Sequence, residues 1–400
     1  MFFTLEAVKA KHGDSLLVHL GTQGDRRLLI IDGGPSGVYE DFLKPRLQKL
    51  SGGKAGLPVR MLMVSHIDDD HINGVLDMTA ELEQQRQDQE ELSYDIRTLW
   101  HNSFNDIMGD EADEVLKSFQ DEVGPVDTAS LEGEVEFTGP ISKGTALVLA
   151  SVPQGRTLRN RCEALGLSVN KPFRGLVLSL DKGEAIDPPL APQVETIVVG
   201  PSIKRVKEFR EEWDKILKEK DLAQDPDEVA TAAYEDKSPF NLASIVVLMR
   251  CQGKSMLLTG DARGDDILAG LSRNKLLDGE GRLHVDILKL PHHGSDRNVE
   301  TNFFRSITAD HYVVSGDGRH HNPEIATFEM LFSARRDDDR PFTIHMTYAP
   351  DDLKINSKKA FPVKKLKEVF RREKEAGRDF TLVHPAGEKS LKVNLLDAIP

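Results

Sequence analysis

Two stretches of this 400-residue chain match one another without a gap, and each closes on an aspartate. When "DSLLVHLGTQGDRRLLIIDG" (14–33) is set above "ASIVVLMRCQGKSMLLTGDA" (243–262), serine, glutamine, glycine and aspartate fall at matching positions. Each stretch has the pattern of a β-hairpin, and each is followed by another apolar strand that ends in histidine. Two similar β-rich halves facing each other would bring these strand ends to one edge. Because hairpins share sequence patterns, a chance match is the alternative.

Strand-like runs alternate with helical patterns along the rest of the chain, and turn signals separate them. Such interleaving favours a layered α/β protein, and 39% hydrophobic residues are enough to form its core. We expect a main domain over residues 1–330, with an insertion at about 76–240. The remainder, 331–400, has the pattern of a strand, a helix and two strands. It is either an appended α/β element or the end of the same domain.

The composition bears on partners and location. The formal net charge of -14 argues against a protein that coats nucleic acid nonspecifically, because such binding needs clustered Lys and Arg. The apolar runs are far shorter than the ~20 residues that span a bilayer, and the N-terminal stretch lacks the basic start of a signal peptide. We therefore expect a cytoplasmic protein without membrane contact. Cys162 and Cys251 form no paired motif, so any metal must be held by histidine and carboxylate.

The densest cluster of charge and imidazole is "VSHIDDDHINGV" (64–75), which follows an apolar strand. Residues 66–71 are predicted to form a strand-to-helix turn, with the chain bending away at Gly74. Three consecutive aspartates would repel one another in a partly buried turn, and a divalent cation reverses that effect. Imidazole and carboxylate suit zinc, manganese or iron, while the excess of oxygen donors favours harder ions. The alternative is an exposed acidic loop, the usual fate of a short charged run.

The same kinds of side chain also close two strands of the second half. Asp261 ends "LLTGD", and His292 and His293 follow the next strand in "KLPHHGS". Ligand-type groups therefore occupy equivalent strand ends in both halves. Taken together, they predict one metal centre at the edge where the halves meet.

Five motifs, "HGDSLLV", "LIIDGG", "SHIDDDHINGV", "LLTGD" and "LKLPHHGS", in this order, resemble the metallo-β-lactamase fold superfamily. Within it they are most similar to the hydrolase domain of the competence protein ComEC and its stand-alone bacterial relatives. The resemblance covers most of residues 1–330. It implies an αββα four-layer sandwich with two pseudo-symmetric halves, insertions and a C-terminal α/β extension. It also implies one or two divalent metal ions, with zinc or manganese expected.

The resemblance further implies which residues bind metal. The superfamily's H-x-H-x-D-H motif falls on residues 66–71, where an aspartate replaces the usual second histidine. The first site would comprise His66, Asp68 and Asp261, and the second Asp70, His71, Asp261 and His292, with His293 as the competitor of His292. The usual mid-chain histidine has no counterpart, because residues 140–240 contain no histidine. The first site therefore has one ligand fewer, which weakens the case for zinc there.

Several further residues are weaker candidates. His101, in "LWHNSF", follows a short apolar stretch and is either a missing ligand, a substrate contact or a structural histidine. His320 and His321 fall where relatives carry a histidine-rich loop after the last core strand. Asp14 and Asp32 are expected to orient neighbouring ligands or turns rather than to bind metal.

Hydrolysis is the chemistry that this ligand set predicts. A metal-activated water would attack, with Asp70 or Asp261 orienting or deprotonating it, while the metal polarises a phosphoryl or carbonyl oxygen. No nucleophile elbow and no phosphate loop occurs in the sequence, so serine hydrolysis and nucleotide-driven work lack support.

The resemblance to ComEC favours a phosphodiesterase or nuclease among the hydrolases. The alternatives are a small-molecule ester, thioester or lactam hydrolase and a non-catalytic relative that acts as a binding partner. A basic, apolar-striped stretch at 358–374 supports nucleic acid as substrate, with Lys364, Lys365 and Lys367 as contacts, although a solvated surface helix has the same pattern. The oligomeric state has no signal in the sequence.

Overall fold

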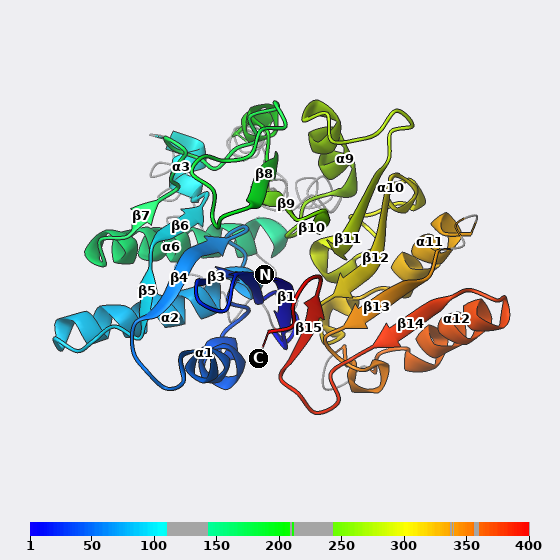
Figure 1. The fold of residues 1–400 in the computed structure, drawn as a ribbon, viewed down its shortest axis with the longest axis horizontal. Helices are drawn as coiled ribbons and strands as arrows, with labels where there is room; N and C mark the ends of the chain where they lie inside the picture. The colour runs from blue at the N-terminus through cyan, green and yellow to red at the C-terminus, as the bar shows by residue number, and fades with distance from the viewer. Residues whose placement is uncertain are drawn as a thin grey trace, which may run out of the picture.

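Two mixed β-sheets packed face to face form the centre of the computed structural model, which describes residues 1–109, 143–208, 210–211, 243–336, 338, 340–355 and 360–399 (Figure 1). In sheet A the strand order is β15-β1-β2-β3-β4-β6-β7, with β5 paired to β4, and in sheet B it is β14-β13-β12-β11-β10-β9-β8. The strands of sheet A are β1 (Phe2–Val8), β2 (Leu16–Gly21), β3 (Arg26–Ile31), β4 (Leu57–Val64), β5 (Tyr94–Ile96), β6 (Thr98–His101), β7 (Ser168–Val169) and β15 (Ser390–Asn394). Those of sheet B are β8 (Val194–Gly200), β9 (Val246–Cys251), β10 (Lys254–Leu258), β11 (Leu283–Lys289), β12 (Ile307–Val314), β13 (Phe342–Met346) and β14 (Phe380–Val383).

The two sheets share one sequence of strand directions. In sheet A, β1, β2 and β3 are antiparallel neighbours and β4 and β6 continue in parallel; in sheet B, β8 to β10 and then β11 and β12 do the same. The matching stretches form the hairpins β2–β3 and β9–β10. Their register agrees as well, since Val18 pairs with Leu29 and Val247 with Leu258, which are corresponding positions. The pseudo-symmetric halves expected from the sequence are present.

Helices cover the outer face of each sheet and complete four layers, α-β-β-α. Over sheet A lie α1 (Lys44–Ser51), α2 (Asp69–Gln87), α3 (Phe104–Met108) and α6 (Lys143–Ala164). Over sheet B lie α9 (Gly264–Arg273), α10 (Thr301–Ser306), α11 (Ile325–Ala334) and α12 (Val363–Glu375). The αββα sandwich predicted from the sequence is confirmed. None of the helices within the described ranges is long and apolar enough to cross a membrane.

Burial on both faces explains the unbroken apolar run in β4. Met61 and Met63 point into the core between the sheets, and Leu62 and Val64 point into the core beneath the helices. A central strand of this kind has no polar side, so alternation disappears from its sequence. Its last residue, Val64, leads directly into the histidine- and aspartate-rich turn.

The C-terminal stretch adds strands to both sheets. From 331–400, β13 and β14 extend sheet B, and β15 returns to pair with β1 in sheet A. The range predicted as an insertion, about 76–240, likewise supplies β6 and β7 to sheet A and β8 to sheet B, and part of it lies outside the described residues. The domain boundaries stay a prediction, but both ranges contribute to the sandwich itself.

Candidate metal centre

The ends of four strands meet at one edge of the sandwich. Asp32 follows β3, the turn from Ser65 to Asp68 follows β4, Asp261 comes shortly after β10, and the two histidines of "PHHG" come after β11. Because β3 and β4 run parallel, as do β10 and β11, their carboxyl ends lie on the same side of each sheet. Packing of the two sheets then brings both sets together.

Asp261 is the carboxylate at the centre of this group. Its side chain is buried, with Oδ1 3.3 Å from Nε2 of His71. Its other oxygen, Oδ2, lies 3.8 Å from Nε2 of His66, 3.6 Å from Nε2 of His292 and 3.5 Å from Nε2 of His293. One buried carboxylate therefore faces four imidazoles, two from each half of the protein. This is the place that a bridging ligand would occupy.

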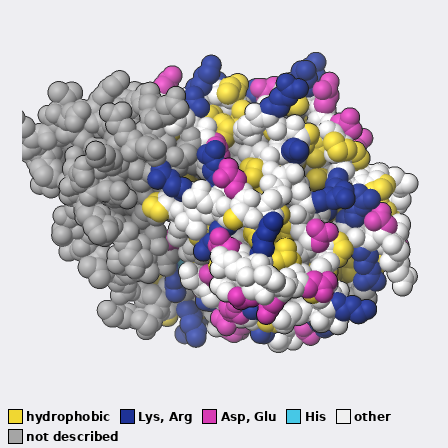
Figure 2. All heavy atoms as spheres, turned by 90° about the vertical axis from the view of Figure 1, so that its left-hand side faces the viewer, with side chains coloured by type: hydrophobic (Ala, Val, Ile, Leu, Met, Phe, Trp, Pro, Cys, Tyr) yellow, Lys and Arg dark blue, Asp and Glu magenta, His cyan; other side chains and the backbone are white. Residues whose placement is uncertain are grey.

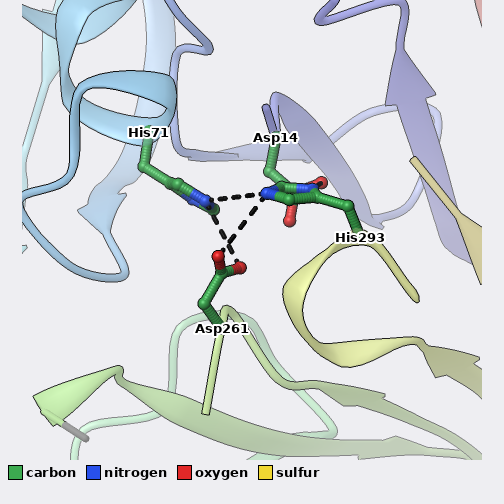
Figure 3. A group of neighbouring side chains, drawn as sticks. All are labelled: Asp14, His71, Asp261 and His293. Carbon is green, nitrogen blue, oxygen red and sulfur yellow. Dashed lines mark hydrogen bonds and ion pairs between the residues drawn. The ribbon is translucent and has the colours of Figure 1, made fainter. Parts of the chain in front are cut away.

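His293 and Asp70 close the second side of the centre. Nε2 of His293 lies 3.3 Å from Nε2 of His71 and 3.3 Å from Oδ2 of Asp70. Figure 3 shows His71, Asp261 and His293 pointing toward one another, with Asp14 behind the His293 ring. Asp70 is the more accessible member, because 22% of its side chain is exposed while His71 and His293 are buried.

Helix α2 delivers Asp70 and His71 because it lies very close to the end of β3. A Cβ on Gly74 would lie 2.0 Å from the carbonyl oxygen of Gly33, so neither position has room for a side chain. The Gly33 N–H donates to the carbonyl oxygen of His71, at 2.8 Å. The bend expected at Gly74 was wrong, since this residue lies inside α2 and serves close packing instead. The acidic first turn of α2 also suits the positive end of the helix dipole.

His71 is held from behind by an aspartate. Oδ2 of Asp32 lies 2.8 Å from Nδ1 of His71, and both Asp32 oxygens also accept hydrogen bonds from Ser65. Nδ1 is thus engaged and Nε2 is turned toward Asp261. Asp32 therefore contacts the His71 ring on the side away from the centre. Carboxylates that orient metal-binding histidines often occupy this kind of position.

The charges of the cluster favour a cation between the halves. Burial alone would raise the pKa of Asp261, but the facing imidazoles of His293, His71 and His292 hold it well below the usual range. Burial alone would lower the pKa of His71, but the carboxylates of Asp261, Asp32 and Asp70 raise it well above its ordinary value. Positive charge is therefore strongly favoured at this point, whether protons or a metal ion supply it.

The donor set fits a divalent cation. Nε2 of His66 and Oδ1 of Asp261 are buried atoms without a hydrogen-bond partner, and both belong to the cluster. Among the described residues, two groups place one ligand atom each within 4.8 Å of one another: Asp14, His71, Asp261 and His293, and separately His66, Asp70 and His71. Histidine nitrogen and carboxylate oxygen are ligand types that divalent transition metals take, and the identity of the metal stays a prediction. Each of the two groups could hold a metal ion.

The two histidines of "PHHG" differ in how deeply they lie in the centre, and which of them binds metal stays a prediction. His293, named only as a competitor, belongs to the compact cluster, whereas 27% of the His292 side chain is exposed. Nε2 of His292 nonetheless lies near Oδ2 of Asp261, the oxygen that also faces His66. Nδ1 of His292 lies 2.7 Å from Oδ1 of Asn298. His292 is thus placed where the first site needs another ligand, in the absence of a mid-chain histidine.

Asp68 lies at the rim of the centre. Its Oδ2 is 3.6 Å from Nε2 of His66, and 27% of its side chain is exposed. As the residue that precedes the first turn of α2, it has an extended backbone that turns the chain from strand to helix.

The weaker candidates are more dispersed. His101 ends β6 beside Val64 and is buried, and burial lowers its pKa to about 4, but it belongs to neither ligand group. His320 and His321 lie in an exposed turn after β12. The lysines at 364, 365 and 367 project from the outer face of α12, where Lys367 pairs with Asp351 at 2.6 Å.

One residue near the centre was missed. His12 precedes Asp14 in the loop between β1 and β2 and is 6% exposed, and its ring meets that of His320 edge to face, with centroids 5.5 Å apart. Burial lowers the pKa of His12 to about 3, although the charge of nearby Asp70 opposes this. The available signal was its place in "KHGDS", two residues before Asp14, which the sequence had already singled out.

Comparisons with known proteins find similar solved structures but no matching family. No protein-family model matches the sequence, and no curated protein matches it. Among solved structures, the chain is similar to Zn²⁺-bound PqqB from Methylobacterium extorquens, with 12% identity, a TM-score of 0.34, and coverage of 96% of this chain and 88% of that one. It is also similar to a mutant of CmlA beta-hydroxylase, with 10% identity and a TM-score of 0.35, covering 98% of this chain but only 54% of the other, about half its length.

Proposed function

We propose that this protein is a metal-dependent hydrolase of the metallo-β-lactamase superfamily that cleaves phosphodiester bonds, with nucleic acid as its substrate class. The observation that carries the proposal is the position of Asp261, a buried carboxylate facing imidazoles from both halves and leaving Oδ1 without a hydrogen-bond partner. A divalent cation bound there would supply Lewis acidity and lower the pKa of a water molecule toward neutrality.

The buried histidines of the centre suit metal binding, whereas Asp70 suits contact with water and substrate. His66, His71 and His293 are buried, and Nδ1 of each contacts a neighbouring side chain, which suits ligands. Asp70 is partly exposed at the same centre, so its carboxylate can meet both an incoming water and the substrate. Burial alone would raise the pKa of Asp70, but His71 and His293 keep it well below the usual range, so this group is ionised and its oxygens can accept a hydrogen bond that orients the nucleophile.

Nucleic acid as substrate is supported by the sequence resemblance and by the basic face of α12. Figure 2 draws the side of the molecule away from α12; on its described part, Lys and Arg side chains are interspersed with Asp and Glu, so a uniform basic surface does not cover that side. On α12, Lys364, Lys365 and Lys367 are exposed, so contacts with phosphates there would be local, as expected for an enzyme that cleaves nucleic acid rather than coating it.

The test is hydrolysis of bis-p-nitrophenyl phosphate and of single- and double-stranded DNA and RNA, with zinc, manganese or magnesium added. The wild type should cleave at least one of them, and Asp70→Asn should lower the rate at least ~100-fold while the circular dichroism spectrum stays unchanged. Activity on a thioester or lactone panel, with none on any phosphodiester, would replace this proposal with a small-molecule hydrolase.

A triple variant separates nucleic acid from small phosphodiesters. Replacing Lys364, Lys365 and Lys367 by Ala should weaken turnover of DNA or RNA and reduce its salt sensitivity, because fewer phosphates are contacted. Turnover of the small phosphodiester should change far less, since these side chains lie on the outer face of α12. An equal loss on both kinds of substrate would argue against nucleic-acid contact at α12.

A further inference from the structure

A fully buried lysine stands directly behind the candidate metal centre. Lys289, the last residue of β11, is 0% exposed, and its Nζ lies 2.8 Å from Oδ2 of Asp14 and donates to the carbonyl oxygen of Leu290 at 2.9 Å. Asp14 is buried as well. Burying an ammonium group is costly unless a partner compensates it, so this ion pair requires an explanation beyond packing.

Asp14 is joined to His293 through a serine. Ser315, just after β12, donates its hydroxyl proton to Oδ1 of Asp14, and its Oγ lies 3.0 Å from Nδ1 of His293. A hydroxyl group carries one proton, and here the carboxylate accepts it. Toward His293 the Ser315 oxygen can then only accept, which requires a proton on Nδ1. A neutral His293 in this position carries its lone pair on Nε2, the nitrogen that faces Asp70, Asp261 and His71.

We propose that Lys289, Asp14 and Ser315 are positioning residues that fix His293 as the Nδ1–H tautomer, so that Nε2 is available to a divalent cation; this inference rests on the proposed metal centre. Asp14 lies within reach of the cluster, but its two oxygens are already engaged by Ser315 and Lys289. Its role is therefore exercised through His293 rather than as a ligand.

Each half places an acceptor beside Nδ1 of one histidine, but the residues that do so differ. In the first half, Asp32 contacts Nδ1 of His71 directly at 2.8 Å. In the second half, the carboxylate comes from the opposite half, in the loop between β1 and β2. Oδ1 of Asp14 lies 3.6 Å from Nδ1 of His293, and the Ser315 hydroxyl group contacts both atoms at shorter distances. His293 thus acquires its orientation only where the two halves are docked. If Asp14 were uncharged, Ser315 could turn its proton toward Nδ1, and Nε2 would then carry the proton and lose its affinity for metal.

The direct test observes the tautomer by long-range ¹H–¹⁵N correlation on metal-free protein labelled with ¹⁵N-histidine, at alkaline pH where the imidazoles are neutral. His293→Ala assigns the signal. The wild type and Ser315→Thr should show the Nδ1–H form, whereas Ser315→Ala, which lacks the acceptor, should show Nε2–H or a mixture. Ser179→Ala removes another buried serine hydroxyl, one that bonds Asn274 and Asp181, and should leave the signal unchanged.

A second readout is the affinity for Zn²⁺ or Mn²⁺ alone, measured by competition with a chelator. Ser315→Ala should weaken binding ~10–100-fold, and Ser315→Thr should restore it. An unchanged tautomer together with unchanged affinity in folded Ser315→Ala would overturn the inference. The tautomer is measured without metal or substrate, so a wild type that lacks phosphodiesterase activity would count against the proposed function and leave this result standing.

Discussion

Nε2 of His71 lies 3.3 Å from Nε2 of His293, although the two residues come from opposite halves of the sandwich. Both rings are anchored at Nδ1, by Asp32 and by Ser315, so each ring presents Nε2 to the centre. Two imidazole nitrogens at this distance can share at most one proton, and two converging lone pairs are satisfied by a common cation. This contact is the geometric basis for expecting metal.

Divalent metal should stabilise the folded protein. Because the candidate ligands converge only when the two halves are docked, a divalent metal should bind the native state alone, and about 2.7 kcal/mol of stability is expected at a free concentration 100 times Kd. Calorimetric unfolding with added metal and then with chelator measures this, alongside elemental analysis. His71→Ala should lose most of the effect. Metal content well below one equivalent in the reconstituted wild type would contradict the expectation.

His292 and His293 should differ in their contribution to metal binding. His293→Ala removes a buried member of the compact cluster and should abolish binding at the second site. His292→Ala should spare that site and weaken only the first, because 27% of this side chain is exposed and it contacts Asp261 from the side of His66. Metal stoichiometry of the two variants, purified in parallel, decides between them. The reverse result would restore the order predicted from the sequence.

Asp68 tests whether the rim of the centre takes part in binding. If Oδ2 of Asp68 is a ligand beside His66, Asp68→Ala should lower affinity for the first ion ~10–100-fold. Titration with a metal-sensitive dye reports the constants of both ions. Asp95→Ala, an exposed aspartate of β5, is the matched control. Equal affinity in the two variants would make Asp68 a bystander of the turn.

Stability at acidic pH should depend on a buried glutamate far from the metal. Burial alone would raise the pKa of Glu6, but hydrogen bonds from His19, Arg46 and Ser390 lower it from 4.5 to about 2. The ionised form is thus favoured in the folded state. Its contribution, about 3 kcal/mol, is complete above pH ~4.5 and is lost as the pH falls toward 2.

Glu6→Gln should therefore lower the free energy of unfolding at neutral pH and flatten its pH dependence between about 4.5 and 2. Urea unfolding at a series of pH values measures both. Glu368→Gln is the comparison, because Glu368 pairs with Arg371 on the exposed face of α12 and should contribute little. If the free energy of unfolding of Glu6→Gln followed the same pH dependence as that of the wild type, the charge of Glu6 would not be the source of the acid sensitivity.

Local signals in the sequence were sufficient to predict the four layers of the sandwich and the edge at which the candidate metal centre lies. Alternation, turn residues and the match between 14–33 and 243–262 depend on neighbouring residues, and they located both hairpins correctly. The placement of His66 and Asp261 shortly after strands, and of His71 at the start of the following helix, follows from the same local patterns. Gly74 was misread because a glycine at a turn and a glycine at a close helix–strand contact look alike in sequence.

Only the tertiary structure decided which groups face one another. His292 and His293 both adopt left-handed backbone, with φ of 47° and 53°, and that unusual turn directs the buried imidazole of His293 into the cluster, a choice that residue order cannot reveal. The contacts of Lys289 with Asp14, and of His12 with His320, join segments far apart in the chain. Sequence patterns report which face of an element is buried, whereas direction and partner depend on how the two halves dock, and docking is a property of the packed sheets alone.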